Sequence, residues 1–243
     1  MDQLTDFADS RLINDCIYCG GAPDTREHVP SRTFLDKPYP NNLPVVGCCD
    51  ECNKSFSKDE QYVVCLIESI LAGSTDPEKI RRAAVGRTMR RAPALRARIE
   101  SAIRQHDDCV EFAVEEDRLR NIMLKLAKGH AVYELREVFK KEPSHFWCGA
   151  LSSVTNEELE SFEASHFQEM FGEVGCRNLQ RLVVMQLQLE AENGSPMSMG
   201  LLMNDWIEVQ EGNYRYMAIS EAGGVSIRIV IAEYLGCEII WRV

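Results

Sequence analysis

The chain has 243 residues, of which 45% are hydrophobic and 27% are charged, values typical of a globular protein with a self-sufficient core. Its formal net charge of −11 argues against a protein that coats nucleic acid indiscriminately. No apolar run approaches the roughly 18 residues that span a bilayer, and the acidic N-terminus lacks the basic start of a signal peptide. We therefore expect a cytoplasmic protein with no membrane partner.

Two close pairs of cysteines mark the first 52 residues. Cys16-x2-Cys19 and Cys49-x2-Cys52 each place two thiolates on one side of a tight turn. Four thiolates in two such pairs suit a tetrahedral structural zinc ion, which prefers soft ligands. Cys48 could replace Cys49 as a ligand, although the matching two-residue gap favours Cys49. Buried free thiols are the alternative interpretation.

Helical patterns follow the second cysteine pair. Apolar spacings of three and four residues predict a helix from about Asp50, and Gly73 is expected to end it. Asp76 as N-cap and Pro77 in the first turn predict the start of a further helix. Pro93 divides the arginine-rich region that follows into two short helices.

The later part of the chain changes from helices to strands. Residues 117–142 give the clearest helical pattern, with His130 on its apolar stripe as a core residue, and residues 155–171 predict another helix. Alternation and β-branched residues then predict strands, with a turn at the two glycines before the third. The predicted strands cover 182–189, 214–219, 225–234 and 237–243.

A basic segment interrupts the acidic chain. Residues 61–104 carry nine Lys and Arg against four Asp and Glu, whereas the segments before and after are acidic. Arginine offers bidentate contacts to phosphate, so the segment could bind nucleic acid. It could equally be a solvated helix face neutralised by the acidic C-terminal part. The expected phosphate contacts in this segment are Arg82, Arg87, Arg90 and Arg91. Arg32, four residues after His28, is a further expected phosphate contact.

The residues around the cysteine pairs occur in a recognisable order. Glu27-His28-Val29-Pro30 lies between the pairs, Asn42-Leu43 follows, and Asn53 comes directly after Cys52. In this order and spacing the sequence resembles the HNH endonucleases, the zinc-knuckle branch of the ββα-metal (His-Me) finger nucleases. The resemblance covers roughly residues 13–65.

The resemblance implies a metal-dependent endonuclease that hydrolyses phosphodiester bonds, with DNA favoured over RNA. His28 would be the general base, and Asn42 would orient it. Glu27 and Asn53 would hold one divalent cation, Mg²⁺ or Mn²⁺, beside the structural Zn²⁺. The family more often has Asp at the position of Glu27 and His at that of Asn53. Phage defence or a mobile element is the implied setting, with a homodimer or a defence-system protein as partner.

Two alternatives remain open at this stage. His28 could merely hydrogen-bond inside a zinc finger, in which case the protein is a non-catalytic zinc module that binds nucleic acid or a protein. Glu60, two helical turns after Asn53, could approach the same face or be a solvated helix residue, and the solvated position is favoured.

The expected fold class is α+β, in three parts. Residues 1–73 are expected to form the zinc-stapled ββα-metal finger, and residues 74–106 a basic helical connector. Residues 107–243 are expected to form a mixed α/β domain, of unknown role, that ends in antiparallel strands.

Overall fold

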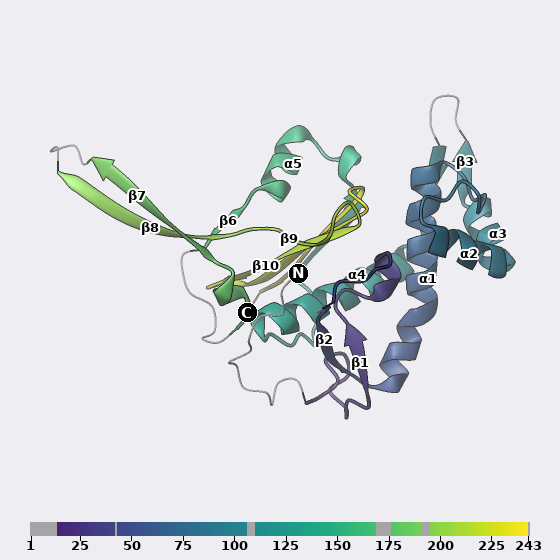
Figure 1. Cartoon of the computed structure of the whole chain (residues 1–243), viewed down its shortest axis with the longest axis horizontal. Helices are drawn as coiled ribbons and strands as arrows, with labels where there is room; N and C mark the ends of the chain where they lie inside the picture. Colours follow the sequence, from purple (N-terminus) through teal and green to yellow (C-terminus); the bar gives the residue numbers. More distant parts are fainter. Residues whose placement is uncertain (1–13, 42, 106–109, 169–175, 191–194, 243) are drawn as a thin grey trace.

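The computed structural model describes residues 14–41, 43–105, 110–168, 176–190 and 195–242. Within these residues the chain forms a mixed α/β fold with five α-helices and antiparallel sheets (Figure 1). The helices are α1 (Asp50–Ala72), α2 (Ala83–Arg91), α3 (Pro93–Ser101), α4 (Glu116–His130) and α5 (Asn156–Glu163). The strands are β1 (Thr25–His28), β2 (Val45–Cys48), β3 (Ile103–Gln105), β4 (Val110–Phe112), β5 (His145–Ala150), β6 (His166–Gln168), β7 (Val183–Glu190), β8 (Pro196–Asn204), β9 (Ile207–Gln210), β10 (Tyr214–Glu221), β11 (Gly224–Ile231) and β12 (Leu235–Arg242).

The N-terminal part is a two-stranded sheet followed by a long helix. β1 and β2 pair antiparallel, and α1 begins directly after Cys49, whose sulfur accepts the backbone N–H of Cys52 at 3.4 Å as the helix N-cap. At the other end Gly73 has a φ of 58°, a left-handed conformation that glycine adopts without steric cost. The helix predicted between Asp50 and Gly73 is confirmed.

The two helices α2 and α3 lie beside the C-terminal half of α1 in Figure 1. Pro93 separates them, as predicted. The helix predicted to begin at Asp76 and Pro77 is wrong, because residues 77–79 form only a turn and α2 begins later. The residue before α2, Arg82, has an extended backbone, and its guanidinium donates to the Leu35 carbonyl at 2.7 Å. A tertiary contact therefore sets the start of this helix.

The helix predicted over 117–142 is shorter in the structure. After α4 the chain forms a π-helical turn, η3 (Ala131–Leu135), and Arg136 then takes a left-handed conformation with φ 65°. Glu134 in this turn is fully buried, and its Oε1 accepts a hydrogen bond from the Tyr216 hydroxyl at 2.6 Å. Contacts with a distant sheet thus prevail over the helical periodicity of the sequence.

The largest sheet contains the strands predicted at the C-terminus, in the order β5-β12-β11-β10-β9. These strands pair antiparallel, which confirms the prediction that the chain ends in antiparallel strands. Ile227 and Ile229 of β11 belong to the core that includes α4. Arg228 between them donates to the Phe162 carbonyl of α5 at 3.0 Å. Because neighbouring residues of a strand point to opposite faces, α4 and α5 cover opposite faces of the sheet.

The segment around α5 partly follows the prediction. Thr155 caps the helix and forms a capping box with Glu158, but the helix ends at Glu163, before the end of the predicted range 155–171. Residues 169–171 lie outside the described part of the chain. The strand predicted over 182–189 is β7, which pairs with β8 in a ribbon that projects from the body (Figure 1).

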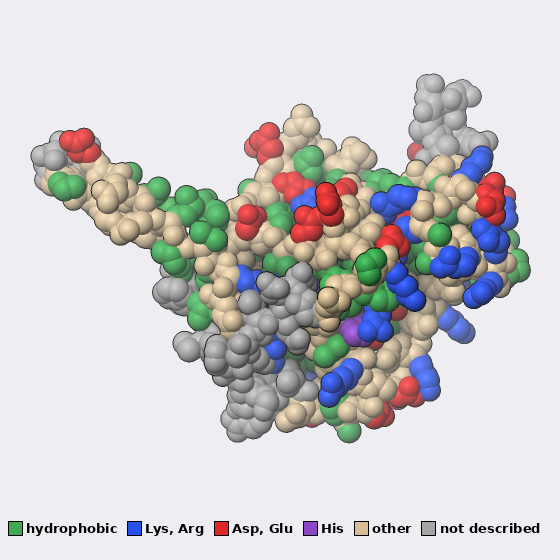
Figure 2. All heavy atoms as spheres, viewed as in Figure 1, with side chains coloured by type: hydrophobic (Ala, Val, Ile, Leu, Met, Phe, Trp, Pro, Cys, Tyr) green, Lys and Arg blue, Asp and Glu red, His purple; other side chains and the backbone are tan. Residues whose placement is uncertain are grey.

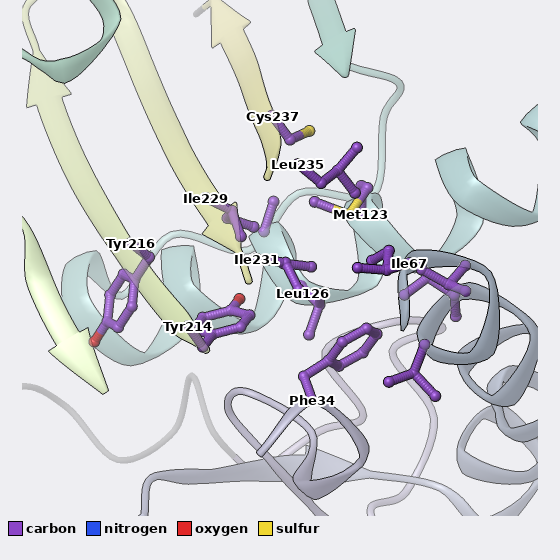
Figure 3. Close-up of a cluster of buried hydrophobic side chains, with 14 of the residues drawn as sticks. Phe34, Ile67, Met123, Leu126, Tyr214, Tyr216, Ile229, Ile231, Leu235 and Cys237 are labelled. Atoms are coloured by element: carbon purple, nitrogen blue, oxygen red, sulfur yellow. The ribbon is translucent and has the colours of Figure 1, made fainter. Parts of the chain in front are cut away.

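One buried cluster joins distant parts of the chain (Figure 3). It packs Phe34, which lies before α1, and Ile67 of α1 against Leu126 of α4 and against Ile229 and Leu235 of the sheet. The core draws on all three predicted parts, whose boundaries stay a prediction, and it fixes α1 against α4. Among the described residues, none of the helices combines the length and apolar composition needed to cross a membrane.

Candidate metal centre and active site

Four cysteines predicted as zinc ligands lie together. The Sγ atoms of Cys16, Cys19, Cys49 and Cys52 are all within 4.8 Å of one another. The Sγ atoms of Cys19 and Cys49 are 3.7 Å apart. Four sulfurs at ~2.3 Å from a central zinc ion stand about 3.8 Å apart in a tetrahedron, so these thiols fit the ion. The four-cysteine cluster could therefore hold zinc.

Local backbone geometry forms each half of the cluster. In the first pair a tight turn joins Cys16 to Gly21, whose carbonyl accepts the Cys16 N–H at 2.7 Å. Gly20 within this turn has φ 80°, which requires glycine in practice. The Gly21 N–H donates to Cys19 Sγ at 3.4 Å, as the Cys52 N–H does to Cys49 Sγ. Backbone N–H groups thus point at the sulfurs that would carry negative charge on a metal.

The electrostatics of the cluster favour a thiolate at one position. Burial opposes ionisation of Cys16, yet backbone hydrogen bonds from Cys19, Cys49 and Tyr18 outweigh it and lower the pKa of this thiol to about 6. Burial, followed by the neighbouring thiols, raises the pKa of Cys52 well above its usual range. A bound cation would remove this repulsion and ionise all four thiols.

Cys48 is set apart from the cluster. Its side chain is fully buried, and its Sγ donates to the Cys49 carbonyl at 3.3 Å. Burial raises the pKa of Cys48 to about 12, and the negative charge of Cys16 adds to this effect. A neutral, hydrogen-bonded thiol is a packing residue. Of the two neighbours Cys48 and Cys49, the one that lies in the four-cysteine cluster is Cys49.

His28 is the last residue of β1, the first strand of the hairpin that the cluster joins to α1. Its imidazole is half-buried, and Arg32 lies four residues further on. Burial, and then the positive charge of Arg32, lowers the pKa of His28 below 6.5. The ring is therefore neutral near pH 7, as a group must be to accept a proton.

The carboxylate beside His28 has a partner that the sequence analysis did not select. Lys125 Nζ donates to Glu27 Oε1 at 2.9 Å and to Glu60 Oε1 at 2.5 Å. The lysine side chain is 2% exposed and each glutamate side chain is 10% exposed. The favoured position of Glu60 as a solvated residue is wrong, because it faces the same buried group as Glu27.

The surroundings of this ion-pair cluster, Glu27, Lys125 and Glu60, are largely apolar. Lys125 Nζ lies 5.1 Å from the centre of the Phe56 ring. Burial raises the pKa of Glu60, although the Lys125 ammonium opposes this effect. Burial also raises the pKa of Tyr18, with the charges of Glu27 and Glu60 adding to it. His28 and Lys125 line one narrow space between β1 and α4.

Asn53 and Asn42 are the remaining residues of the predicted site. Asn53 Nδ2 donates to Thr25 Oγ1 at 3.4 Å, and that hydroxyl donates to the Cys48 carbonyl at 2.8 Å. This bridge joins the first turn of α1 to the hairpin. Asn42 lies outside the described residues.

A divalent cation does not fit between Glu27 and its neighbours as they stand. Mg²⁺ and Mn²⁺ need oxygen ligands at about 2.0–2.3 Å around a central position. The ammonium of Lys125 fills the position next to Glu27, and Asn53 is directed at Thr25 through its amide nitrogen. No reaction step is therefore assigned to such a cation.

The predicted phosphate contacts differ in exposure. Arg32, Arg87, Arg90 and Arg91 are exposed, and Lys and Arg side chains gather over α2 and α3 in Figure 2. Arg90 also pairs with Glu78 at 3.0 Å. Arg82 is only 6% exposed, and its guanidinium contacts Asp36 and backbone carbonyls. This structural role does not fit the phosphate contact predicted for Arg82.

Comparison of the chain with protein-family models, with curated proteins and with solved structures finds no match.

Proposed function

We propose that the chain is a zinc-stabilised nuclease of the HNH type that hydrolyses phosphodiester bonds, with DNA as the favoured substrate. The observation that carries this proposal is the position of the four-cysteine cluster. It joins a β-hairpin, whose first strand ends in Glu27-His28, to the first turn of α1. Zinc supplies no catalytic step here; bound to Cys16, Cys19, Cys49 and Cys52, it stabilises the arrangement.

His28 acts as the general base in this proposal. The neutral imidazole takes a proton from a water molecule, and the resulting hydroxide oxygen bonds to phosphorus while the bond to one bridging oxygen breaks. The leaving oxygen takes a proton from solvent, and His28 returns its proton to solvent. Arg32, exposed and close enough to lower the pKa of His28, contacts the phosphate.

The basic surface of α2 and α3 binds the substrate backbone in this proposal. The phosphate contacts proposed on it are the exposed residues Arg87, Arg90 and Arg91 of α2, and Arg87 and Arg91 form no ion pair with a residue that the structure describes. Guanidinium groups on an outward helix face suit phosphate contacts without base recognition. A role in phage defence or a mobile element, as a homodimer or with a protein partner, belongs to the same proposal.

A second candidate is a zinc module that binds nucleic acid or a protein without cutting it. The contact between Lys125 and Glu27 favours this candidate, because the residue expected to bind a catalytic cation is already neutralised. Both candidates predict zinc and a basic surface. They differ in whether phosphodiester bonds are broken and whether breakage depends on His28.

A cleavage assay separates the two candidates. Zinc-containing protein is incubated with supercoiled plasmid and with RNA, with and without Mg²⁺ or Mn²⁺. We expect His28→Ala to slow cleavage by about 10²–10⁴-fold, the usual contribution of a general base. His145→Ala, at an exposed histidine of β5, is the matched control and should retain the full rate.

The possible outcomes are distinct. Full cleavage by His28→Ala, in a preparation free of contaminating nuclease, would contradict the proposed role of His28. Binding of nucleic acid without cleavage by the unaltered protein would favour the non-catalytic module.

A further inference from the structure

The ion-pair cluster of Glu27, Lys125 and Glu60 is buried between three elements of the fold. Its members come from β1, α4 and α1, and Lys125 lies 98 residues after Glu27 in the chain. Burial of a lone ammonium is strongly unfavourable, and here two carboxylates surround the one lysine. The three groups are arranged by the core packing of α1 against α4.

The ammonium occupies the centre of this set. Its nitrogen is within hydrogen-bond distance of one oxygen from each glutamate, at 2.9 Å and 2.5 Å. Two converging carboxylates around a central cation are the arrangement that otherwise binds a divalent metal through oxygen. Here the central cation is part of the chain. A metal ion could enter only by displacing a side chain that is 2% exposed.

We propose that Lys125 takes the place of a divalent cation between Glu27 and Glu60, so that this site carries a fixed ammonium charge and binds no metal. Lys125 is a positioning residue: it holds Glu27, the neighbour of His28 on β1, in place through a buried ion pair. The suggestion that His28 chemistry proceeds beside this ammonium rests on the proposed function. The statement about metal binding does not, because it concerns the ion-pair cluster alone.

Metal titration of zinc-containing protein tests the proposal without any substrate. Mn²⁺ is titrated into the full chain, with zinc content measured before and after, and free Mn²⁺ is followed by electron paramagnetic resonance. For the unaltered protein we expect no saturable Mn²⁺ site tighter than about 1 mM, the weak end of protein sites for hard cations.

Removing the ammonium should create a metal site. In Lys125→Met the two carboxylates lose their cation, and we expect about one Mn²⁺ per chain bound at least about tenfold more tightly than by the unaltered protein. A second substitution, Glu60→Gln, should abolish the new site. Lys128→Met, on the same helix and half-buried, is the matched control and should leave Mn²⁺ binding unchanged.

Two results would overturn the proposal. One is a tight Mn²⁺ site in the unaltered protein that Glu27→Gln abolishes, a measurement that remains decisive where Lys125→Met fails to fold. The other is a folded Lys125→Met variant that binds Mn²⁺ no better than the unaltered protein. Loss of nuclease activity alone affects the proposed function and leaves this proposal standing, because the titration contains no nucleic acid.

Discussion

Replacing Cys49 and Cys48 one at a time by serine tests the metal centre at neighbouring positions. Cys49→Ser removes one of four clustered sulfurs, whereas Cys48→Ser changes a buried thiol that points at the Cys49 carbonyl. Serine is among the preferred N-cap residues, so at position 49 it can still cap α1 by accepting the Cys52 N–H. The comparison therefore isolates the loss of a metal ligand from the loss of a helix cap.

The expected magnitudes differ widely. Changes to groups that merely orient a ligand cost about 10–100-fold in metal affinity, so loss of the Cys49 ligand should exceed about 100-fold. A factor of 100 corresponds to about 2.7 kcal/mol at 25 °C. Because zinc binding stabilises the folded hairpin, the free energy of unfolding should fall with it. Cys48→Ser should keep its zinc and lose about 1–3 kcal/mol, the usual effect of an imperfectly paired buried hydroxyl.

Zinc content and affinity provide the assay. Elemental analysis of protein purified without chelator should find about one zinc per chain in the unaltered protein and in Cys48→Ser. Competition with a chromophoric chelator gives the relative affinities. Equal zinc affinity in Cys49→Ser and the unaltered protein, or loss of zinc only in Cys48→Ser, would show that the four-cysteine assignment is wrong.

Two further predictions concern the basic surface and a buried histidine. The exposed arginines of α2 are changed together to glutamine: Arg87, Arg90 and Arg91. The slope of log affinity for DNA against log salt should flatten by about 0.7–0.9 for each lost phosphate contact, while the same change at Lys140, Lys141 and Arg242 leaves it unaltered. An unchanged slope in the arginine variant would assign these residues to the solvated helix face. Burial, and then Arg181, holds the pKa of His130 well below 6.5. Its stabilising effect as a neutral group is therefore complete above pH 6.5 and is lost as the pH falls below it, by at most about 1.4 kcal/mol per pH unit. Urea unfolding between pH 5 and 7.5 should show a weaker pH dependence in His130→Gln, and identical slopes would refute this reasoning.

The sequence correctly predicted those helix ends and strands whose structure depends on residues close together in the chain. Gly73 ends α1 because a left-handed residue is needed there, and Pro93 separates α2 from α3. Thr155 starts α5 through its own side chain. The C-terminal strands follow from alternation, because one face of each strand packs on the core.

The predictions that were wrong concern segments whose structure depends on contacts with residues distant in the sequence. The helix predicted over 117–142 changes at η3, where Glu134 accepts a hydrogen bond from Tyr216, 82 residues later in the chain. The helix predicted at Asp76 gives way to the contacts of Arg82 with the loop after η2 (Arg32–Phe34). Sequence periodicity contains no information about such partners.

The candidate site shows the same division. The cysteine spacing correctly predicted a four-sulfur cluster, because each pair is a local turn. Lys125 was missed, since a lysine in an amphipathic helix is normally solvated and no local pattern places it beside Glu27. Lys125 lies on the apolar stripe of α4, three residues after Ile122 and directly before Leu126 and Ala127. This position was the one signal in the sequence that could have indicated its burial.

The central claim is that His28 acts as a general base. The most direct test is how the rate of phosphodiester cleavage by the protein depends on pH. Single-turnover rates at subsaturating substrate, which report the pKa of the substrate-free protein, are compared for the unaltered protein and for Arg32→Gln. Because burial and Arg32 lower the pKa of His28, the unaltered rate should fall only below an apparent pKa that is itself below 6.5. Arg32→Gln removes one of the two causes, so its inflection should move to higher pH. A rate that does not decrease as the pH falls through this range, or an inflection that Arg32→Gln leaves in place, would contradict the role assigned to His28.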